Sequence, residues 1–257
     1  MSEITYIPFE EESEEIKKRV TDYWSERADS FLEQRQHELA SPKAQMWKKE
    51  ILAWLPAPET LQEPFKVLDV GCGAGYFTAL LGKEGYHVTG IDLTQEMVGK
   101  AQELIAGNGP YPGSVTVMEM DAEQLSFADE TFDAVITRNL TWTLPHPVEA
   151  YQEWYRVLKK GGILLNFDAE YAKNAHALFT PESEAHKNIS NQMKEDCHAL
   201  YHMLTISALD RPEWDKEVLL RIGFRDVKID LSFSDRIFAV RDEFYIPDKM
   251  FMIGAEK

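Results

Sequence analysis

Three glycines and a nearby aspartate form the part of the sequence that is best suited to holding a ligand. The stretch VLDVGCGAGYF places Gly71, Gly73 and Gly75 directly after an apolar run that contains Asp69. A turn without Cβ atoms can bend sharply and lets a ligand approach the backbone. A helix that begins near Tyr76 would offer unpaired N–H groups to a carboxylate or phosphate. This turn therefore predicts a binding site for a small molecule or cofactor.

Later apolar runs also end in residues that can form hydrogen bonds or ion pairs. VTGIDLT, MEMDAEQLSF and FDAVITRNL each place such residues at or just beyond the end of the run. In a sheet of parallel strands, ligands bind beyond the carboxyl ends of the strands. The residues expected at that edge, besides those of the glycine turn, are Asp92, Leu93, Asp121, Ala122, Arg138 and Asn139.

The order of the elements predicts how these residues are positioned. Strand-like apolar runs alternate with helical segments, which indicates a parallel, doubly wound sheet buried on both faces. The predicted fold class is α/β: a doubly wound, mostly parallel, seven-stranded Rossmann-like sheet. The expected strands lie at 66–71, 87–93, 115–122, 132–139 and 162–169, with two more near 225–233 and 245–257.

Two helical regions stand outside this alternation. Residues 1–60 contain two amphipathic segments, and a polar stretch with several histidines interrupts the pattern at about 170–211. We expect both regions to form a lid over the sheet. The predicted organisation is an N-terminal helical lid at 1–60 and a ligand-binding domain at 61–257 that carries the helical insertion.

Composition narrows the function further. The formal net charge is −17, from 44 acidic and 27 basic residues, so the chain would repel a polyanion and nucleic acid is not an expected partner. Two cysteines give no disulfide framework, and the acidic start is not a signal peptide. No apolar run approaches the ~20 residues needed to span a bilayer. A cytoplasmic protein without a membrane partner is predicted, whereas the sequence does not indicate the oligomeric state.

The stretch VLDVGCGAGYF strongly resembles the first motif of class I S-adenosylmethionine-dependent methyltransferases, and the resemblance extends from about Val67 to Asp168. It implies S-adenosylmethionine as cofactor, with Asp69 near the methionine ammonium, Asp92 on the ribose hydroxyls and Asp121 on the adenine amino group. The full set of cofactor-binding residues that it implies is Asp69, Gly71, Gly73, Gly75, Asp92, Leu93, Asp121, Ala122, Arg138 and Asn139.

The function implied by this resemblance is methyl transfer to a small-molecule acceptor at N, O, S or C. Two alternatives stay open: a sensor module that binds S-adenosylmethionine without turnover, and a methyltransferase that acts on a metal-chelating acceptor. A nucleotide-dependent oxidoreductase is disfavoured, because the dinucleotide pattern requires glycine or alanine where Tyr76 stands. RNA or protein methylation is disfavoured because no basic stripe is evident.

The acceptor site is expected beside the methyl group, with Tyr23, Trp142 and His146 as its candidate catalytic residues. His146 could accept a proton or could cap a helix that starts at Pro147. Other residues expected in this region are Trp24, Arg27, His37, Asp168 and Tyr171, although Tyr23 and Trp24 could equally be core residues of their helix.

The insertion carries His198 and His202, which share one face of a helix at a spacing of four. Two ligands are too few for a metal site, so a pair that lies on the surface or lines the lid is the preferred interpretation, and no metal is predicted.

Overall fold

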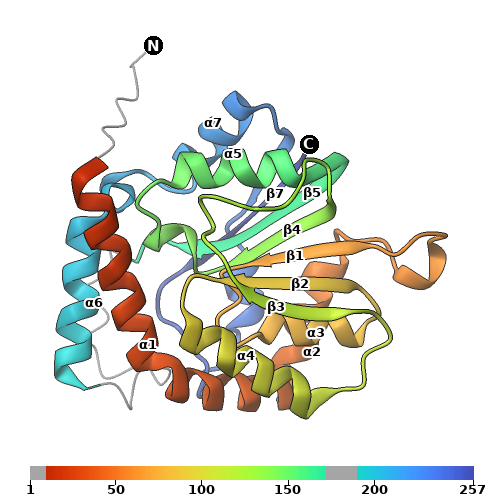
Figure 1. Ribbon diagram of the computed structural model, residues 1–257, viewed down its shortest axis with the longest axis horizontal. Coiled ribbons are helices and arrows are strands. Elements are labelled where there is room, and N and C mark those ends of the chain that lie inside the picture. The colour runs from red at the N-terminus through yellow and green to blue at the C-terminus, as the bar shows by residue number, and fades with distance from the viewer. Residues whose placement is uncertain (1–9, 172–189) are drawn as a thin grey trace.

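A single sheet of seven strands forms the centre of the molecule. The computed structural model describes residues 10–171 and 190–257 (Figure 1). The strand order is β3-β2-β1-β4-β5-β7-β6, and every neighbouring pair is parallel except those that β7 makes with β5 and β6. The predicted fold class is therefore confirmed. The strands are β1 Lys66–Val70, β2 His87–Asp92, β3 Val115–Glu119, β4 Phe132–Arg138, β5 Leu158–Ala169, β6 Arg225–Asp230 and β7 Met250–Glu256.

Helices cover both faces of this sheet (Figure 1). On one face lie α5 (Pro147–Val157) and α7 (Glu213–Ile222), which bring Trp154 and Trp214 into one hydrophobic cluster. The opposite face carries a second cluster that joins Trp47 and Phe77 to Phe233. The helices of this second face are α2 (Pro42–Leu52), α3 (Tyr76–Lys83), α4 (Gln95–Asn108) and α8 (Phe233–Ile237).

Two further helices stand across the carboxyl ends of the strands. The long α1 (Glu10–Ala40) lies beside α6 (Asn191–Met203), although about 150 residues separate them in the sequence (Figure 1). Ser41 ends α1 and caps α2 by accepting a hydrogen bond from the Lys43 N–H at 3.1 Å. At this cap the chain passes from α1, at the carboxyl ends of the strands, to α2, on the face of the sheet that also carries α3 and α4.

The two regions predicted to form a lid, residues 1–60 and about 170–211, correspond only in part to the helices at the strand ends. Of the N-terminal region, α1 stands at the strand ends, whereas α2 packs in the core with Trp47 and Ile51 fully buried. Of the insertion at about 170–211, residues 172–189 lie outside the described part of the chain, and α6 is its described helix. Division of the chain at residue 60 and closure of a lid both stay predictions.

Within residues 10–171 and 190–257, no helix combines the length and the apolar character that crossing a membrane requires.

Candidate active site

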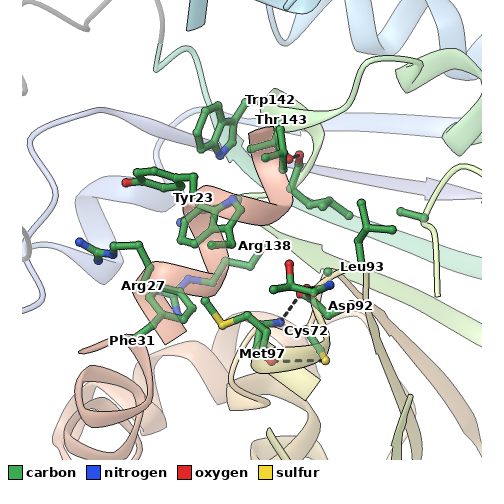
Figure 2. A pocket seen from close by; sticks show the side chains of 18 of the residues that line it. Tyr23, Arg27, Phe31, Cys72, Asp92, Leu93, Met97, Arg138, Trp142 and Thr143 are labelled. Atoms are coloured by element: carbon green, nitrogen blue, oxygen red, sulfur yellow. Dashed lines mark hydrogen bonds between the residues drawn. The ribbon is translucent and has the colours of Figure 1, made fainter. Parts of the chain in front are cut away.

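A cavity opens at the carboxyl ends of β1 to β4, and residues of α1 and α6 also line it. Figure 2 shows several of the side chains that line this cavity. It leaves ≈ 210 Å³ for the centres of water molecules, where a single water needs ~10–15 Å³. The structure brings together nine of the ten residues predicted to hold the cofactor. The nine that line the cavity are Asp69, Gly71, Gly73, Asp92, Leu93, Asp121, Ala122, Arg138 and Asn139.

The glycine turn is shaped by its backbone. Gly71 and Gly73 have φ of +65° and +53°, a region that favours glycine. A Cβ on Gly71 would stand 2.7 Å from Leu140 Cδ1. The Gly73 N–H donates a hydrogen bond to Asp92 Oδ2 at 2.9 Å, which ties the turn to the end of β2. The turn therefore presents bare backbone to the cavity.

Gly75 differs from the other two glycines because it does not line the cavity. Its φ is +83°, and a Cβ there would lie 3.0 Å from the Cβ of Ala101 and 3.2 Å from its Cα. The third glycine thus allows α3 and α4 to pack closely. Its predicted direct role at the ligand has no support in this geometry.

Asp69 lies beneath the turn and is 2% exposed. Its carboxylate accepts a hydrogen bond from the Thr78 hydroxyl at 2.6 Å. Burial raises the pKa of Asp69 to about 7, an effect that the Thr78 bond partly offsets. A buried carboxyl group at this position favours a cationic neighbour, since a positive charge would stabilise the ionised form.

Asp92 supplies a second carboxylate to the cavity. Its two oxygens accept backbone N–H bonds from Gly73 at 2.9 Å and from Thr94 at 3.0 Å. Each carboxylate oxygen can accept a further bond, so the side chain is held in place and still has acceptor capacity. Burial raises the pKa of Asp92, although the two backbone hydrogen bonds act to lower it.

Asp121 lies in an ion-pair network that the sequence analysis did not identify. Lys17 Nζ of α1 stands 2.7 Å from Asp121 Oδ2 and 2.6 Å from Glu123 Oε2. Burial alone would lower the pKa of Lys17, but its bonds to the two carboxylates raise it. Glu123 also accepts the His146 backbone N–H at 2.6 Å. Lys17 therefore connects α1 to the adenine end of the predicted cofactor site.

A second network joins α1 to β4 at the other end of the cavity. Glu38 is fully buried and accepts hydrogen bonds from Arg138 at 3.1 and 3.3 Å, from Trp47 Nε1 at 3.0 Å, and from Arg35. Two guanidinium groups thus share one carboxylate, which leaves the cluster with one net positive charge beside the glycine turn. In the sequence, Arg35 and Glu38 look like an ordinary surface pair at i and i+3.

Aromatic side chains line the part of the cavity that α1, α6 and the loop after β4 form. Tyr23 and Trp24 line it from α1, and Trp142 packs between Tyr171 and Tyr201 with ring centroids 5.5 and 4.9 Å away. Figure 2 shows the side chains of Tyr23 and Trp142. Tyr23 and Trp142 thus line the same cavity as the residues of the cofactor motifs. Their predicted role in catalysis stays a prediction.

Three other predicted residues do not line this cavity. His146 occupies the N-cap position of α5, but its side chain makes no capping hydrogen bond, so the capping interpretation is wrong. Asp168 is fully buried and accepts bonds from Arg211 and from the Trp142 N–H, both at 2.9 Å, so its carboxylate supports the site from behind. The side chain of His37 is 57% exposed near the end of α1.

The described helix of the insertion lines the cavity with one face. Lys194, Cys197, His198 and Tyr201 all contribute to it, as expected for residues three or four apart. His202 is exposed, although its ring centroid lies 4.6 Å from that of His198. Among the described residues there is no group of three or more side chains that could hold a metal ion.

These charges fit the cofactor that the motifs imply. We call Asp69, Asp92, Asp121 and Glu123 the acidic floor, and the cavity-lining face of α1 and α6 the roof. S-adenosylmethionine carries a sulfonium and an ammonium group, which suit the acidic floor. Its single carboxylate suits the net positive cluster around Glu38.

Comparisons with known proteins agree with this geometry. Residues 68–166 match the family model of a methyltransferase domain. An uncharacterized protein of Haemophilus influenzae is 31% identical over 182 residues, which cover 70% of this chain and 66% of that protein. The ubiquinone/menaquinone biosynthesis C-methyltransferase of Bartonella henselae is 33% identical over 123 residues, 47% of this chain and 46% of that one. The chain thus spans less than two thirds of each of these relatives.

Among solved structures, phosphoethanolamine N-methyltransferase 2 of Haemonchus contortus, in complex with S-adenosylmethionine, has the same fold. The TM-score is 0.54 at 19% identity, and the match covers 81% of this chain and 52% of that one. Fold, motif and family model together define an α/β protein with a methyltransferase domain. Residues 68–166 thus form a methyltransferase domain, and the sequence motifs and the fold around it are like those of class I S-adenosylmethionine-dependent methyltransferases.

Proposed function

We propose that this protein transfers the methyl group of S-adenosylmethionine to a small-molecule acceptor held between the floor and the roof. One observation carries the proposal: the residues of the cofactor motifs and the aromatic residues of α1, α6 and the loop after β4 line one continuous cavity. A cofactor on the floor would therefore lie in contact with an acceptor under the roof. Two of the proteins compared above are named a C-methyltransferase and an N-methyltransferase, so these names do not identify the acceptor atom.

The bound cofactor supplies a methyl group that is already electrophilic, so the protein mainly has to align the acceptor and exclude water. The glycine turn and Asp92 would hold the ribose and methionine parts. Trp24 and Trp142 would cover the reacting centre with apolar surface. No conspicuous catalytic triad is needed for this chemistry.

Protonation states on the acceptor side limit how a proton could leave. Burial raises the pKa of Tyr23, Tyr171 and Tyr201, so these hydroxyl groups stay protonated near pH 7 and do not serve as proton acceptors. His198 lines the cavity, whereas His146 does not. Where the acceptor must lose a proton, we assign the role of proton acceptor to His198 in place of His146.

A turnover assay tests the proposal. The full chain is incubated with S-adenosylmethionine and a panel of small acceptors, and S-adenosylhomocysteine is quantified by chromatography. We expect product with at least one acceptor, loss of product in Asp92→Ala, and retention in His37→Gln, a histidine of α1 outside the cavity. Tight S-adenosylhomocysteine binding without turnover across the panel would favour the sensor module instead.

A further inference from the structure

Charge is divided unevenly between the two sides of the cavity. Among the described residues, the lining carboxylates belong to the sheet side of the cavity: Asp69 lies in β1, Asp92 ends β2, and Asp121 and Glu123 follow β3. Within the same part of the chain, the roof contributes no lining carboxylate. The charged residues of the roof are instead Lys17, Arg27, Arg35 and Lys194. The chain has 44 acidic and 27 basic residues, so a surface of average composition would carry more acidic than basic side chains. The roof shows the opposite.

Two of these four positive charges are paired with carboxylates, whereas Arg27 forms no ion pair within residues 10–171 and 190–257. Lys17 is held by Asp121 and Glu123, and Arg35 by Glu38. Arg27 is 4% exposed, its Nε has no hydrogen-bond partner, and no carboxylate of the described residues forms an ion pair with it. A buried charge without a partner is costly, so the position calls for a compensating anion.

The immediate neighbours of Arg27 cannot supply that anion. Its electrostatic partners are the Tyr23 hydroxyl and the Cys197 thiol. Burial raises the pKa of both groups, so both are neutral near pH 7. Burial lowers the pKa of Arg27, yet a guanidinium starts so high that it stays charged.

The place of Arg27 on α1 separates it from the cofactor contacts. It lies ten residues after Lys17 and eight before Arg35, which is ~15 Å and ~12 Å along a helix axis. Its side chain lies on the same side of α1 as Tyr23, away from Asp92 and the glycine turn (Figure 2). Lys194 of α6 lines the same cavity, and no described carboxylate forms an ion pair with it.

We propose that Arg27 binds an anionic group of the methyl acceptor, so that the acceptor is a small organic acid that carries a carboxylate or a phosphate. This rests on the proposed function. A guanidinium offers two parallel N–H donors to the two oxygens of such a group, which gives orientation as well as affinity. The aromatic residues beside it suit an acceptor whose remaining part is apolar.

Calorimetric titration of the full chain saturated with S-adenosylhomocysteine tests this inference with matched probes. Benzoate is compared with benzamide, and phenyl phosphate with phenol. We expect each acid to bind ~10-fold or more tightly than its neutral partner, as a charge-assisted bond implies. Whichever of benzoate and phenyl phosphate binds more tightly shows whether the site prefers a carboxylate or a phosphate.

Variants assign the preference to one residue. Arg27→Gln should abolish the preference for acids and Arg27→Lys should keep part of it, while neither changes affinity for S-adenosylhomocysteine. The matched control is Arg19→Gln, because Arg19 lies on the same helix, is exposed and pairs with Glu15. This control should behave as the wild type does.

The outcomes separate the two proposals. If the wild type fails to bind S-adenosylhomocysteine, the proposed function fails. If it binds that ligand but shows no preference for acids, the inference about Arg27 is overturned. The comparison of acids with neutral probes uses the wild type alone, so it does not depend on the folding of a variant. Retention of the preference in Arg27→Gln would overturn it too, as would a large loss of S-adenosylhomocysteine affinity there, since Arg27 would then belong to the cofactor.

Discussion

The floor and the roof of the cavity are built in different ways. The floor is fixed by backbone: Asp92 accepts the N–H groups of Gly73 and Thr94, which are its neighbours at the ends of β1 and β2. The roof is attached by side chains. Lys17 of α1 reaches Asp121 and Glu123, and Arg138 of β4 reaches Glu38 of α1, each through a long flexible side chain.

This difference suggests a division of work. A floor held by main-chain hydrogen bonds presents the same surface to every ligand, which suits one invariant cofactor. A roof held by a few ion pairs can differ in its residues without loss of the sheet, which suits the choice of an acceptor. The predictions below test whether floor and roof can be damaged separately.

The largest effect is expected on the floor. Asp92→Ala removes acceptors for two ribose hydroxyls, each charge-assisted bond contributing ~1.5–3 kcal/mol. Affinity for S-adenosylhomocysteine should fall ~100-fold or more in calorimetry. Since Asp92 also braces the glycine turn, circular dichroism must show that the variant is folded. Wild-type affinity in a folded variant would remove Asp92 from the cofactor site.

The roof should respond next. Glu38→Ala leaves the buried guanidinium groups of Arg35 and Arg138 without their shared carboxylate, and breaking such a cluster costs ~3–5 kcal/mol. Urea unfolding should show a loss of free energy of unfolding of that size. Glu33→Ala, an exposed position on the same helix, is the control and should lose little. A loss below ~1 kcal/mol in Glu38→Ala would mean that the cluster does not hold α1 in place.

A smaller effect is expected from the protonation of Asp69. Burial raises its pKa to about 7, above its ordinary value, so its contribution to stability is greatest at low pH and is lost as pH rises through about 7. Between pH 5 and 8 the wild type should lose ~1–3 kcal/mol of unfolding free energy relative to Asp69→Asn. Parallel stability profiles for the two proteins would show that Asp69 titrates normally.

The sequence predicted the floor well because its signals are local. A glycine turn after a buried strand, and acids at the next two strand ends, depend only on positions near each other in the chain. The central strands β1, β4, β5 and β7 read as apolar runs because most of their residues are buried, whereas the edge strands β3 and β6 are largely exposed. The sequence also predicted a cofactor contact for Gly75. This residue has the backbone conformation of the turn, but it packs against Ala101 and does not line the cavity.

The roof was largely out of reach because its contacts are not local. Lys17 meets Asp121 about a hundred residues away, and Glu38 meets Arg138 at a similar separation. In the sequence these residues resemble ordinary charged positions of an exposed helix. Asp168 was placed wrongly for the same reason: it lies near the carboxyl end of β5, but Arg211 from a distant segment donates a hydrogen bond to its carboxylate.

Amide hydrogen exchange with and without S-adenosylhomocysteine tests the division between floor and roof most directly. We predict slower exchange in peptides that cover residues 69–76 at the glycine turn, together with slowing in 15–40 and 190–205 as the roof settles on the ligand. Strands β6 and β7, which are remote from the cavity, serve as the internal reference. Unchanged exchange at the glycine turn with saturating ligand would contradict the assignment of the floor as the cofactor site.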